Sequence, residues 1–85
     1  MLEVILAGNI EAGRLEAEVR NERYDLIAIV YEDNDGWHIE QQGADRIPDD
    51  LLRKIKEDLG SHPNRKGNGA PEEISRGEYS LWLLD

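Results

Sequence analysis

The chain has 85 residues, of which 19 are Asp or Glu and 10 are Lys or Arg, so its formal net charge at pH 7 is −9. A chain of this length forms a single domain, and the lack of cysteine excludes a disulfide framework and thiolate metal sites. The net charge repels phosphate groups, so direct binding of nucleic acid by the folded surface is disfavoured.

The excess of negative over positive charge is confined to the first part of the sequence. Residues 1–50 hold thirteen acidic and four basic side chains, whereas residues 51–85 hold six of each. A surface of one sign sets up a long-range field that attracts partners of the opposite sign. We therefore expect a protein partner with a basic surface.

The N-terminus indicates the compartment. Residues 1–6 hold an acid where a signal peptide has basic residues, and their apolar run is short. No stretch approaches the length of a membrane span. Together with the lack of cysteine, these features predict a cytoplasmic protein with no membrane partner.

Three segments of the first half have the patterns of strands. Residues 2–7 give a first strand with Leu2, Val4 and Leu6 on one face, and residues 14–20 place apolar side chains at every second position, as in a strand with one wet face. Residues 14–20 also contain good helix formers, but we favour the strand. Residues 25–31 are apolar almost throughout, which is typical of a central strand covered on both faces. The inward-facing residues expected in the first two segments are Leu2, Val4, Leu6, Leu15, Ala17 and Val19.

A polar turn follows the third segment. Asp35-Gly36 is a strong hairpin signal, and residues 37–41 form the return strand with Trp37, Ile39 and Gln41 on one face. The turn resembles the start of a calcium loop, but its first and last ligand positions would fall on Tyr31 and Gln42. We therefore interpret it as a hairpin turn.

Residues 48–59 give the clearest helix. Pro48 suits the first helical position, and Asp49 and Asp50 meet the positive end of the helix dipole. Gly60 is a natural stop. The apolar stripe that can pack on a sheet consists of Leu51, Leu52, Ile55 and Leu59.

The last segment has two interpretations. Residues 75–78 match a capping box, which favours a short helix ending near Leu84, whereas the alternation from Tyr79 to Leu84 suits a buried strand. The leucine content favours the helix slightly. The fold class we predict is α+β in a single domain, residues 1–85. It has an antiparallel sheet of about four strands packed by one main helix at residues 48–59, with a C-terminal short helix or extra strand.

No pattern indicates catalysis, a metal or a cofactor. His38 and Glu40 share a strand face, but a metal site needs three or four ligands. Carboxylates are so numerous that no single pair indicates acid–base chemistry. We therefore predict no enzymatic activity, no catalytic residues, no metal site and no cofactor.

The favoured hypothesis is a small acidic protein-binding module. An inhibitor, immunity or antitoxin-like protein can use carboxylates on a rigid sheet to occupy the basic, nucleic-acid-binding groove of an enzyme. The residues predicted to bind the partner are Glu16, Glu18, Glu32, Asp33, Asp35 and Glu40.

Two alternatives stay open. The irregular loop at residues 61–71 is basic, and Arg65 and Lys66 beside its glycines suit a phosphate or another small ligand. A small monomer core also favours a structural domain that self-associates as a homodimer through an open sheet edge or face. The local patch most suited to touching RNA consists of Arg53, Lys54, Lys56, Arg65 and Lys66.

Overall fold

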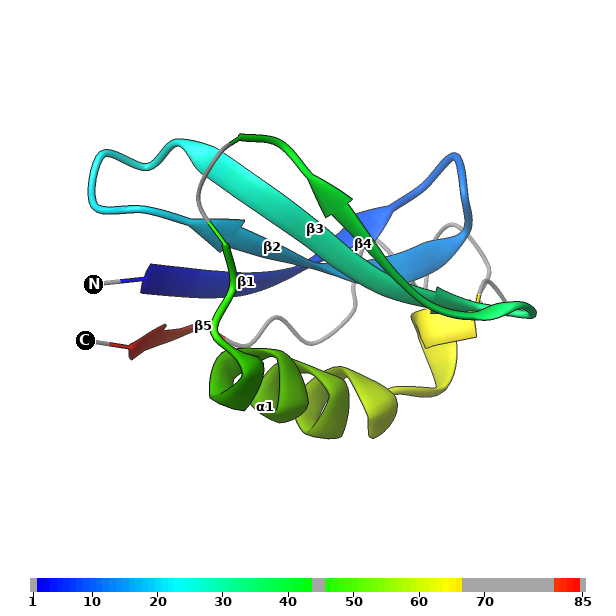
Figure 1. The fold of residues 1–85 in the computed structure, drawn as a ribbon. Coiled ribbons are helices and arrows are strands. Elements are labelled where there is room, and N and C mark those ends of the chain that lie inside the picture. The colour runs from blue at the N-terminus through cyan, green and yellow to red at the C-terminus, as the bar shows by residue number, and fades with distance from the viewer. Residues whose placement is uncertain (1, 44–45, 67–80, 85) are drawn as a thin grey trace.

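The computed structural model describes residues 2–43, 46–66 and 81–84 and shows an α+β fold of two layers (Figure 1). An antiparallel sheet in the order β4-β3-β2-β1-β5 forms one layer, and helix α1 lies against one of its faces. The elements are β1 (Leu2–Asn9), β2 (Arg14–Arg20), β3 (Leu26–Asp33), β4 (Gly36–Gln41), α1 (Asp49–Gly60), the 3-10 helix η1 (Pro63–Lys66) and β5 (Leu81–Leu84). The predicted α+β class, with four successive antiparallel strands and one main helix, is confirmed.

Strands β1 and β2 form a hairpin whose turn is held by Asn9. The amide of Gly13 donates to the Asn9 carbonyl at 2.8 Å, and the amide of Ala12 donates to the Asn9 side chain at 3.1 Å. Gly13 has a φ of 71°, which glycine adopts without strain. Every second residue of β2 is buried, from Leu15 to Val19. The strand interpretation is confirmed, because a helix would distribute these apolar residues around its axis.

Strands β3 and β4 form the second hairpin. Asp33 pairs with Gly36, whose φ is 118°, and the Asp33 carboxylate accepts the amide of Asp35 at 2.8 Å. The polar turn predicted here is confirmed. The expectation that β3 is covered on both faces is wrong for the described part of the chain. Its neighbours β2 and β4 cover its edges, but Ile29 and Tyr31 stay partly exposed on the face away from α1.

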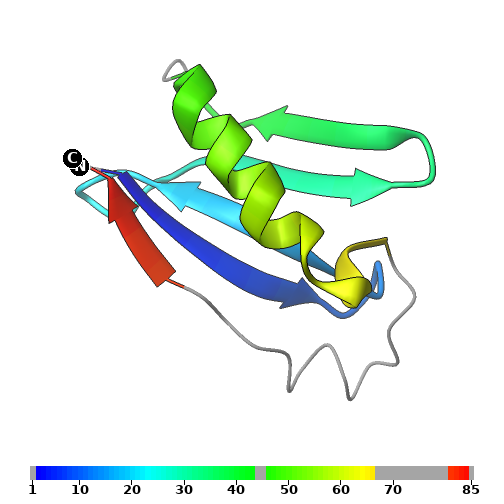
Figure 2. The same ribbon diagram turned by 90° about the horizontal axis from the view of Figure 1, so that it is seen from below.

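Helix α1 lies across one face of the sheet (Figure 2), and its predicted stripe packs there against the core. Leu51, Ile55 and Leu59 are at most 1% exposed. Pro48 is the N-cap, one position before the predicted site, and its carbonyl accepts the amide of Leu52 at 3.0 Å. The sheet residues of the same buried cluster are Val4, Leu6, Leu15, Ala17, Val19, Ile27, Ala28 and Val30.

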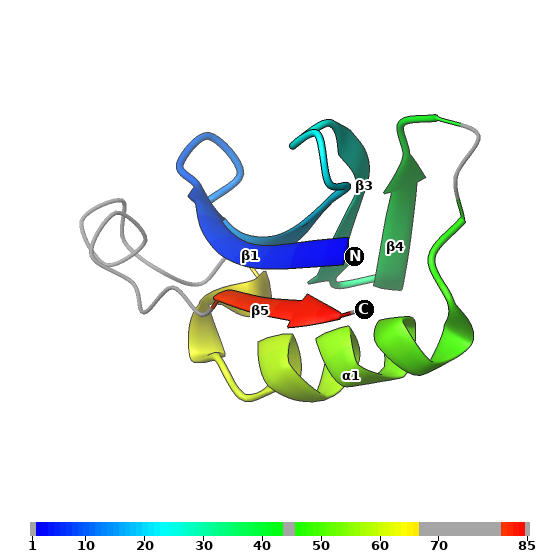
Figure 3. The ribbon, with the colours of Figure 1, turned by 90° about the vertical axis from the view of Figure 1, so that its left-hand side faces the viewer.

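The C-terminal strand β5 pairs antiparallel with the free edge of β1, from Leu2 opposite Leu84 to Ile5 opposite Leu81 (Figure 3). The slight preference for a helix is therefore wrong for residues 81–84. An unpaired edge leaves main-chain groups without hydrogen-bond partners, and β5 supplies these partners for β1. The capping box at residues 75–78 lies outside the described residues.

Neither helix in the described ranges is long and apolar enough to span a membrane.

The burial of α1 predicts the effect of truncating its central side chain. Replacing the fully buried Ile55 by alanine removes apolar contact and leaves a cavity, so the free energy of unfolding should fall by about 2–5 kcal/mol. Urea denaturation followed by circular dichroism measures it. The exposed Glu57 is the control position, where alanine should change the value by less than about 0.5 kcal/mol. A loss below about 1 kcal/mol for Ile55→Ala would contradict this packing.

Candidate protein-binding surface

The sheet face turned away from α1 is the candidate surface, and we call it the open face. Within the described ranges, no helix or strand lies over it (Figure 1). Because side chains alternate along each strand, the registers of the first four strands place the following residues there: Glu3, Ile5, Ala7, Arg14, Glu16, Glu18, Arg20, Ile29, Tyr31, Asp33, His38 and Glu40.

One line of residues crosses four strands of the open face. The registers place Ile5, Glu18, Ile29 and Glu40 opposite one another on β1, β2, β3 and β4. Apolar and acidic side chains therefore alternate along this line, and both isoleucines are partly exposed. The open face is a patterned apolar and acidic surface rather than a uniformly charged one.

Tyr31 lies at the centre of a stack beside this line. The Arg14 guanidinium carbon lies 4.0 Å from the centre of the Tyr31 ring. The ring of His38, opposite Tyr31 in the hairpin, stacks on it with centres 5.1 Å apart and planes 19° apart. A cation over a ring face and two offset rings are both favourable arrangements.

Each member of this stack contacts a carboxylate. Arg14 donates to Glu16 at 2.9 Å, and the Tyr31 hydroxyl donates to Glu40 at 3.2 Å. His38 Nε2 lies 2.8 Å from Asp33 Oδ1. Side chains fixed in this way lose little further conformational freedom when a partner binds, which favours binding.

These contacts shift the pKa values of two groups. Partial burial and the hydrogen bond to Glu40 raise the pKa of the Tyr31 hydroxyl above its usual value. Partial burial opposes ionisation of Asp33, but the amide of Asp35 and the ring of His38 outweigh it and lower the pKa of that carboxyl. Tyr31 is therefore a neutral hydrogen-bond donor and Asp33 a carboxylate at neutral pH.

A second group ties the β2–β3 turn to the open face. Arg20 donates to Glu18 at 2.8 Å and to the Tyr24 carbonyl at 3.0 Å. Its guanidinium carbon lies 4.6 Å from the centre of the Tyr24 ring, which is itself exposed. Tyr24 has a φ of 65°, unusual for a non-glycine residue, and the contact with Arg20 stabilises it there.

The structure places five of the six predicted acidic residues on or beside the open face. Glu16 and Glu18 lie on it, each paired with a neighbouring arginine, and Glu16 is only 12% exposed rather than solvent-facing. Asp33 and Glu40 lie on it through the contacts above. Asp35 lies in the turn at its end and is exposed.

The placement of Glu32 on this face is wrong. Glu32 pairs with Trp37, which packs against the core on the side of α1. Its side chain is 16% exposed and lies 2.7 Å from Arg65 and 3.9 Å from Lys66. Glu32 therefore binds residues of its own chain instead of facing a partner.

The same contacts change the interpretation of the predicted ligand loop at residues 61–71. Both of its cations, Arg65 and Lys66, lie against Glu32, and Arg65 also donates to the His62 carbonyl at 3.0 Å. The rest of the loop, residues 67–71, lies outside the described residues. Other cations of the predicted RNA patch also have partners, since Arg53 lies 3.9 Å from Asp50 and the Lys56 amine 5.9 Å from the centre of the Trp37 ring. The two described cations of the loop, Arg65 and Lys66, are therefore already paired within the chain.

Within the described residues, no group of three His, Cys, Asp or Glu side chains could hold a metal ion. Asp33 can orient His38 as a proton acceptor, but the contacts of His38 given above bring only Tyr31 and Asp33 to its ring.

No family model, curated protein or solved structure matches this chain.

Sequence reasoning missed the stack of Arg14, Tyr31 and His38, because it treated Tyr31 as one residue of an apolar run. The turn between β3 and β4 held the information that predicts this contact. A two-residue loop between Asp33 and Gly36 fixes the register and so places Tyr31 opposite His38.

The contact between Glu32 and Arg65 predicts coupled stability effects. Glu32→Gln and Arg65→Ala should each destabilise the protein, and the double variant should lose less than the sum by about 1 kcal/mol, because both side chains are largely buried. Urea denaturation of the four proteins measures this coupling. Lys66→Ala, at the longer distance of 3.9 Å, should cost less than Arg65→Ala. Additive effects of Glu32→Gln and Arg65→Ala would contradict the contact.

The lowered pKa of Asp33 predicts a pH-dependent effect of Asp33→Asn. A carboxyl with a depressed folded-state pKa stabilises the fold above its unfolded pKa of about 4, and this contribution is lost as the pH falls through the folded-state value. The variant should therefore be less stable than the wild type at pH 7, and the difference should shrink as the pH falls below about 4. Urea denaturation across this range measures it, with Asp35→Asn as the control. A difference that is constant with pH would contradict the shift.

Proposed function

We propose that this protein is a protein-binding module whose open face binds a partner with a basic surface, in the manner of an inhibitor, immunity or antitoxin-like protein. The observation that supports it is an uncovered sheet face with partly exposed Ile5, Ile29 and Tyr31 among fixed carboxylates. Apolar and aromatic groups surrounded by polar ones are typical of protein interfaces.

The charges of the open face favour a cationic partner. Its five carboxylates outnumber its two guanidinium groups, so the face stays negative after Arg14 and Arg20 have paired with Glu16 and Glu18. Glu40 is exposed and its described partner is a neutral hydroxyl, so that contact leaves its charge uncompensated. Uncompensated negative charge therefore lies on the β4 side, where Asp35 is also exposed.

The arginine pairs limit how the partner is bound. A cation approaching Glu16 or Glu18 must compete with an arginine at 2.9 or 2.8 Å, and this competition lowers the net energy that either acid can contribute to binding. We therefore assign the main binding energy to Ile5, Ile29 and Tyr31, and the choice and orientation of the partner to the acids beside β4.

Affinity capture tests this function. The tagged protein is incubated with an extract of its native host at roughly 50 mM salt, and bound proteins are eluted with a salt gradient and identified by mass spectrometry. We expect a protein with a basic surface. The recombinant partner is then titrated against the wild type, against Asp35→Lys/Glu40→Lys and against a matched control, Glu11→Lys/Glu57→Lys. The control makes the same charge change at two exposed positions away from the open face.

The double variant on the β4 side should raise the dissociation constant roughly tenfold or more, which corresponds to about 1.4 kcal/mol, and the control should leave it close to that of the wild type. Equal weakening by the two double variants would show that only net charge matters and would exclude a specific face. Failure to capture any basic protein at low salt would contradict the proposal.

A further inference from the structure

The line of Ile5, Glu18, Ile29 and Glu40 gives the open face a direction, and we call it the cross-strand row. Its members lie opposite one another on four strands, so neighbouring side chains of the row are about 5 Å apart and the two isoleucines about 10 Å apart. The order along the row is apolar, acidic, apolar, acidic. A partner element that follows the row therefore needs apolar and basic groups in alternation at the same spacing.

The row runs across the strands and not along them. Strand β2 separates the two isoleucines, and a segment lying along β2 would meet only charged side chains on the open face, because those side chains are Arg14, Glu16, Glu18 and Arg20. A segment that crosses β2 contacts both isoleucines and both acids of the row instead. The positions of the apolar groups therefore favour a crossing element.

The spacing of the row matches a helix. An α-helix rises about 1.5 Å per residue, so side chains at i, i+3, i+7 and i+10 share one face and lie at about 0, 4.5, 10.5 and 15 Å along its axis. The row needs contacts at about 0, 5, 10 and 15 Å. An extended segment presents one face only every 6.7 Å or about that, so it loses register with the row after the second contact.

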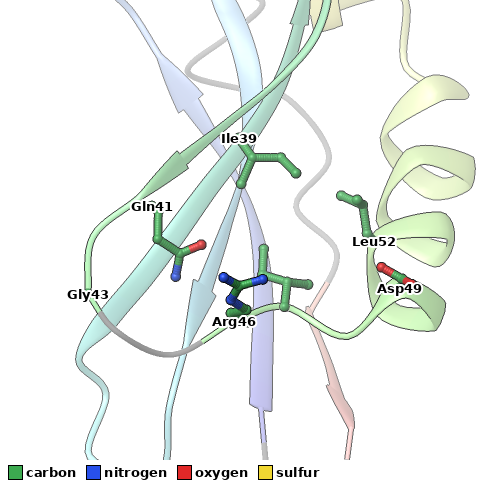
Figure 4. Close-up of a pocket in the computed structure, with 7 residues that line it drawn as sticks. Ile39, Gln41, Gly43, Arg46, Asp49 and Leu52 are labelled. Atoms are coloured by element: carbon green, nitrogen blue, oxygen red, sulfur yellow. The ribbon is translucent and has the colours of Figure 1, made fainter.

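The pocket between β4 and the first turn of α1 is less suited to a cationic partner (Figure 4). Its volume is about 430 Å³, and its charged lining consists of Arg46 and Asp49, which have opposite charges. This lining has no excess of negative charge, unlike the open face. The pocket therefore does not compete with the cross-strand row for the binding element.

We propose that the partner binds through an amphipathic helix that crosses the strands of the open face along the cross-strand row. Apolar side chains at i and i+7 of this helix contact Ile5 and Ile29, and Lys or Arg at i+3 and i+10 contact Glu18 and Glu40. This inference rests on the proposed function and specifies which element of the partner is recognised. Because Glu18 also contacts Arg20 at 2.8 Å, the cation at i+10 contributes more than the cation at i+3.

The described part of the chain does not provide such a helix from a second copy. Helix α1 is its only α-helix, and the apolar stripe of α1, Leu51, Ile55 and Leu59, is buried against its own sheet. Each copy also has a net charge of −9, so two copies repel each other. A helix with lysines or arginines reduces the net charge of the complex instead.

A synthetic peptide tests the inference. The probe is a capped, alanine-rich helix of about 18 residues with Leu at i and i+7, Lys at i+3 and i+10, and Gln at other positions for solubility. One control peptide has proline in place of a central alanine, which breaks the helix. The other control has the same composition but has its lysines at i+5 and i+12, on the opposite side of the helix. Amide nitrogen–proton NMR spectra of the full chain at roughly 50 mM salt report binding at each residue.

We expect the probe to shift the amide signals of Ile5, Glu18, Ile29 and Glu40 together, and both control peptides to bind roughly fivefold or more weakly than the probe. An exchange of charges tests the register. Glu40→Lys should bind the probe more weakly than a peptide with Glu at i+10, which reverses the preference of the wild type. The matched variant Glu57→Lys should keep the wild-type preference.

Other outcomes would overturn the crossing helix. Shift changes at Ile29 without changes at Ile5 would show an element lying along β3, and equal binding of the proline-containing peptide would exclude a helix. Lack of probe binding, with a captured basic partner that Asp35→Lys/Glu40→Lys weakens, would reject this inference and leave the proposed function standing. Row signals that shift with protein concentration alone would assign the face to a second copy. The predicted shifts combined with no basic protein in the capture experiment would reject the proposed function alone.

Discussion

The packing of one apolar helix stripe against one face of a small sheet is the interaction on which the rest of this structure depends. Leu51, Ile55 and Leu59 of α1 complete a buried cluster with side chains from β1, β2 and β3. Burying apolar side chains is the dominant favourable term in folding, and one helix covers only part of the sheet. The opposite face and Ile39 on β4 therefore stay uncovered within the described ranges, and the candidate surface arises from this geometry.

The uncovered face is ordered by polar contacts that follow the strand pleat. Residues Arg14 and Glu16 lie two positions apart on β2, as do Glu18 and Arg20, so each pair shares one side of the same strand. The stack of Arg14, Tyr31 and His38 connects β2, β3 and β4. This order has two opposing consequences for binding. It fixes side chains in advance, but it also gives Glu16 and Glu18 internal partners, so fewer charges are left for a ligand than the composition implies.

The sequence contained most of the fold, because its strongest patterns are local. Strict alternation identified β2, the Asp35-Gly36 turn identified the second hairpin, and the stripe of α1 followed from helical spacing. Glu32 was misplaced because its side depends on the hairpin register, and its partner Arg65 is 33 residues away in the chain. Strand β5 was ambiguous because a leucine-rich segment suits helix and strand alike, and only pairing with β1 decides between them. The local acidic pattern therefore indicated a charged face, but only the structure showed which charges are already paired.

The most direct test of the uncovered face is the solvent exposure of isoleucine methyl groups. With methyl-labelled protein and a soluble gadolinium chelate, NMR relaxation reports how closely solvent approaches each side chain. The structure predicts strong broadening for Ile29 and for Ile39 at the β4 edge, and protection for the buried Ile55. Protection of Ile29 equal to that of Ile55 in the monomer would show that the face is covered, and this would contradict the account.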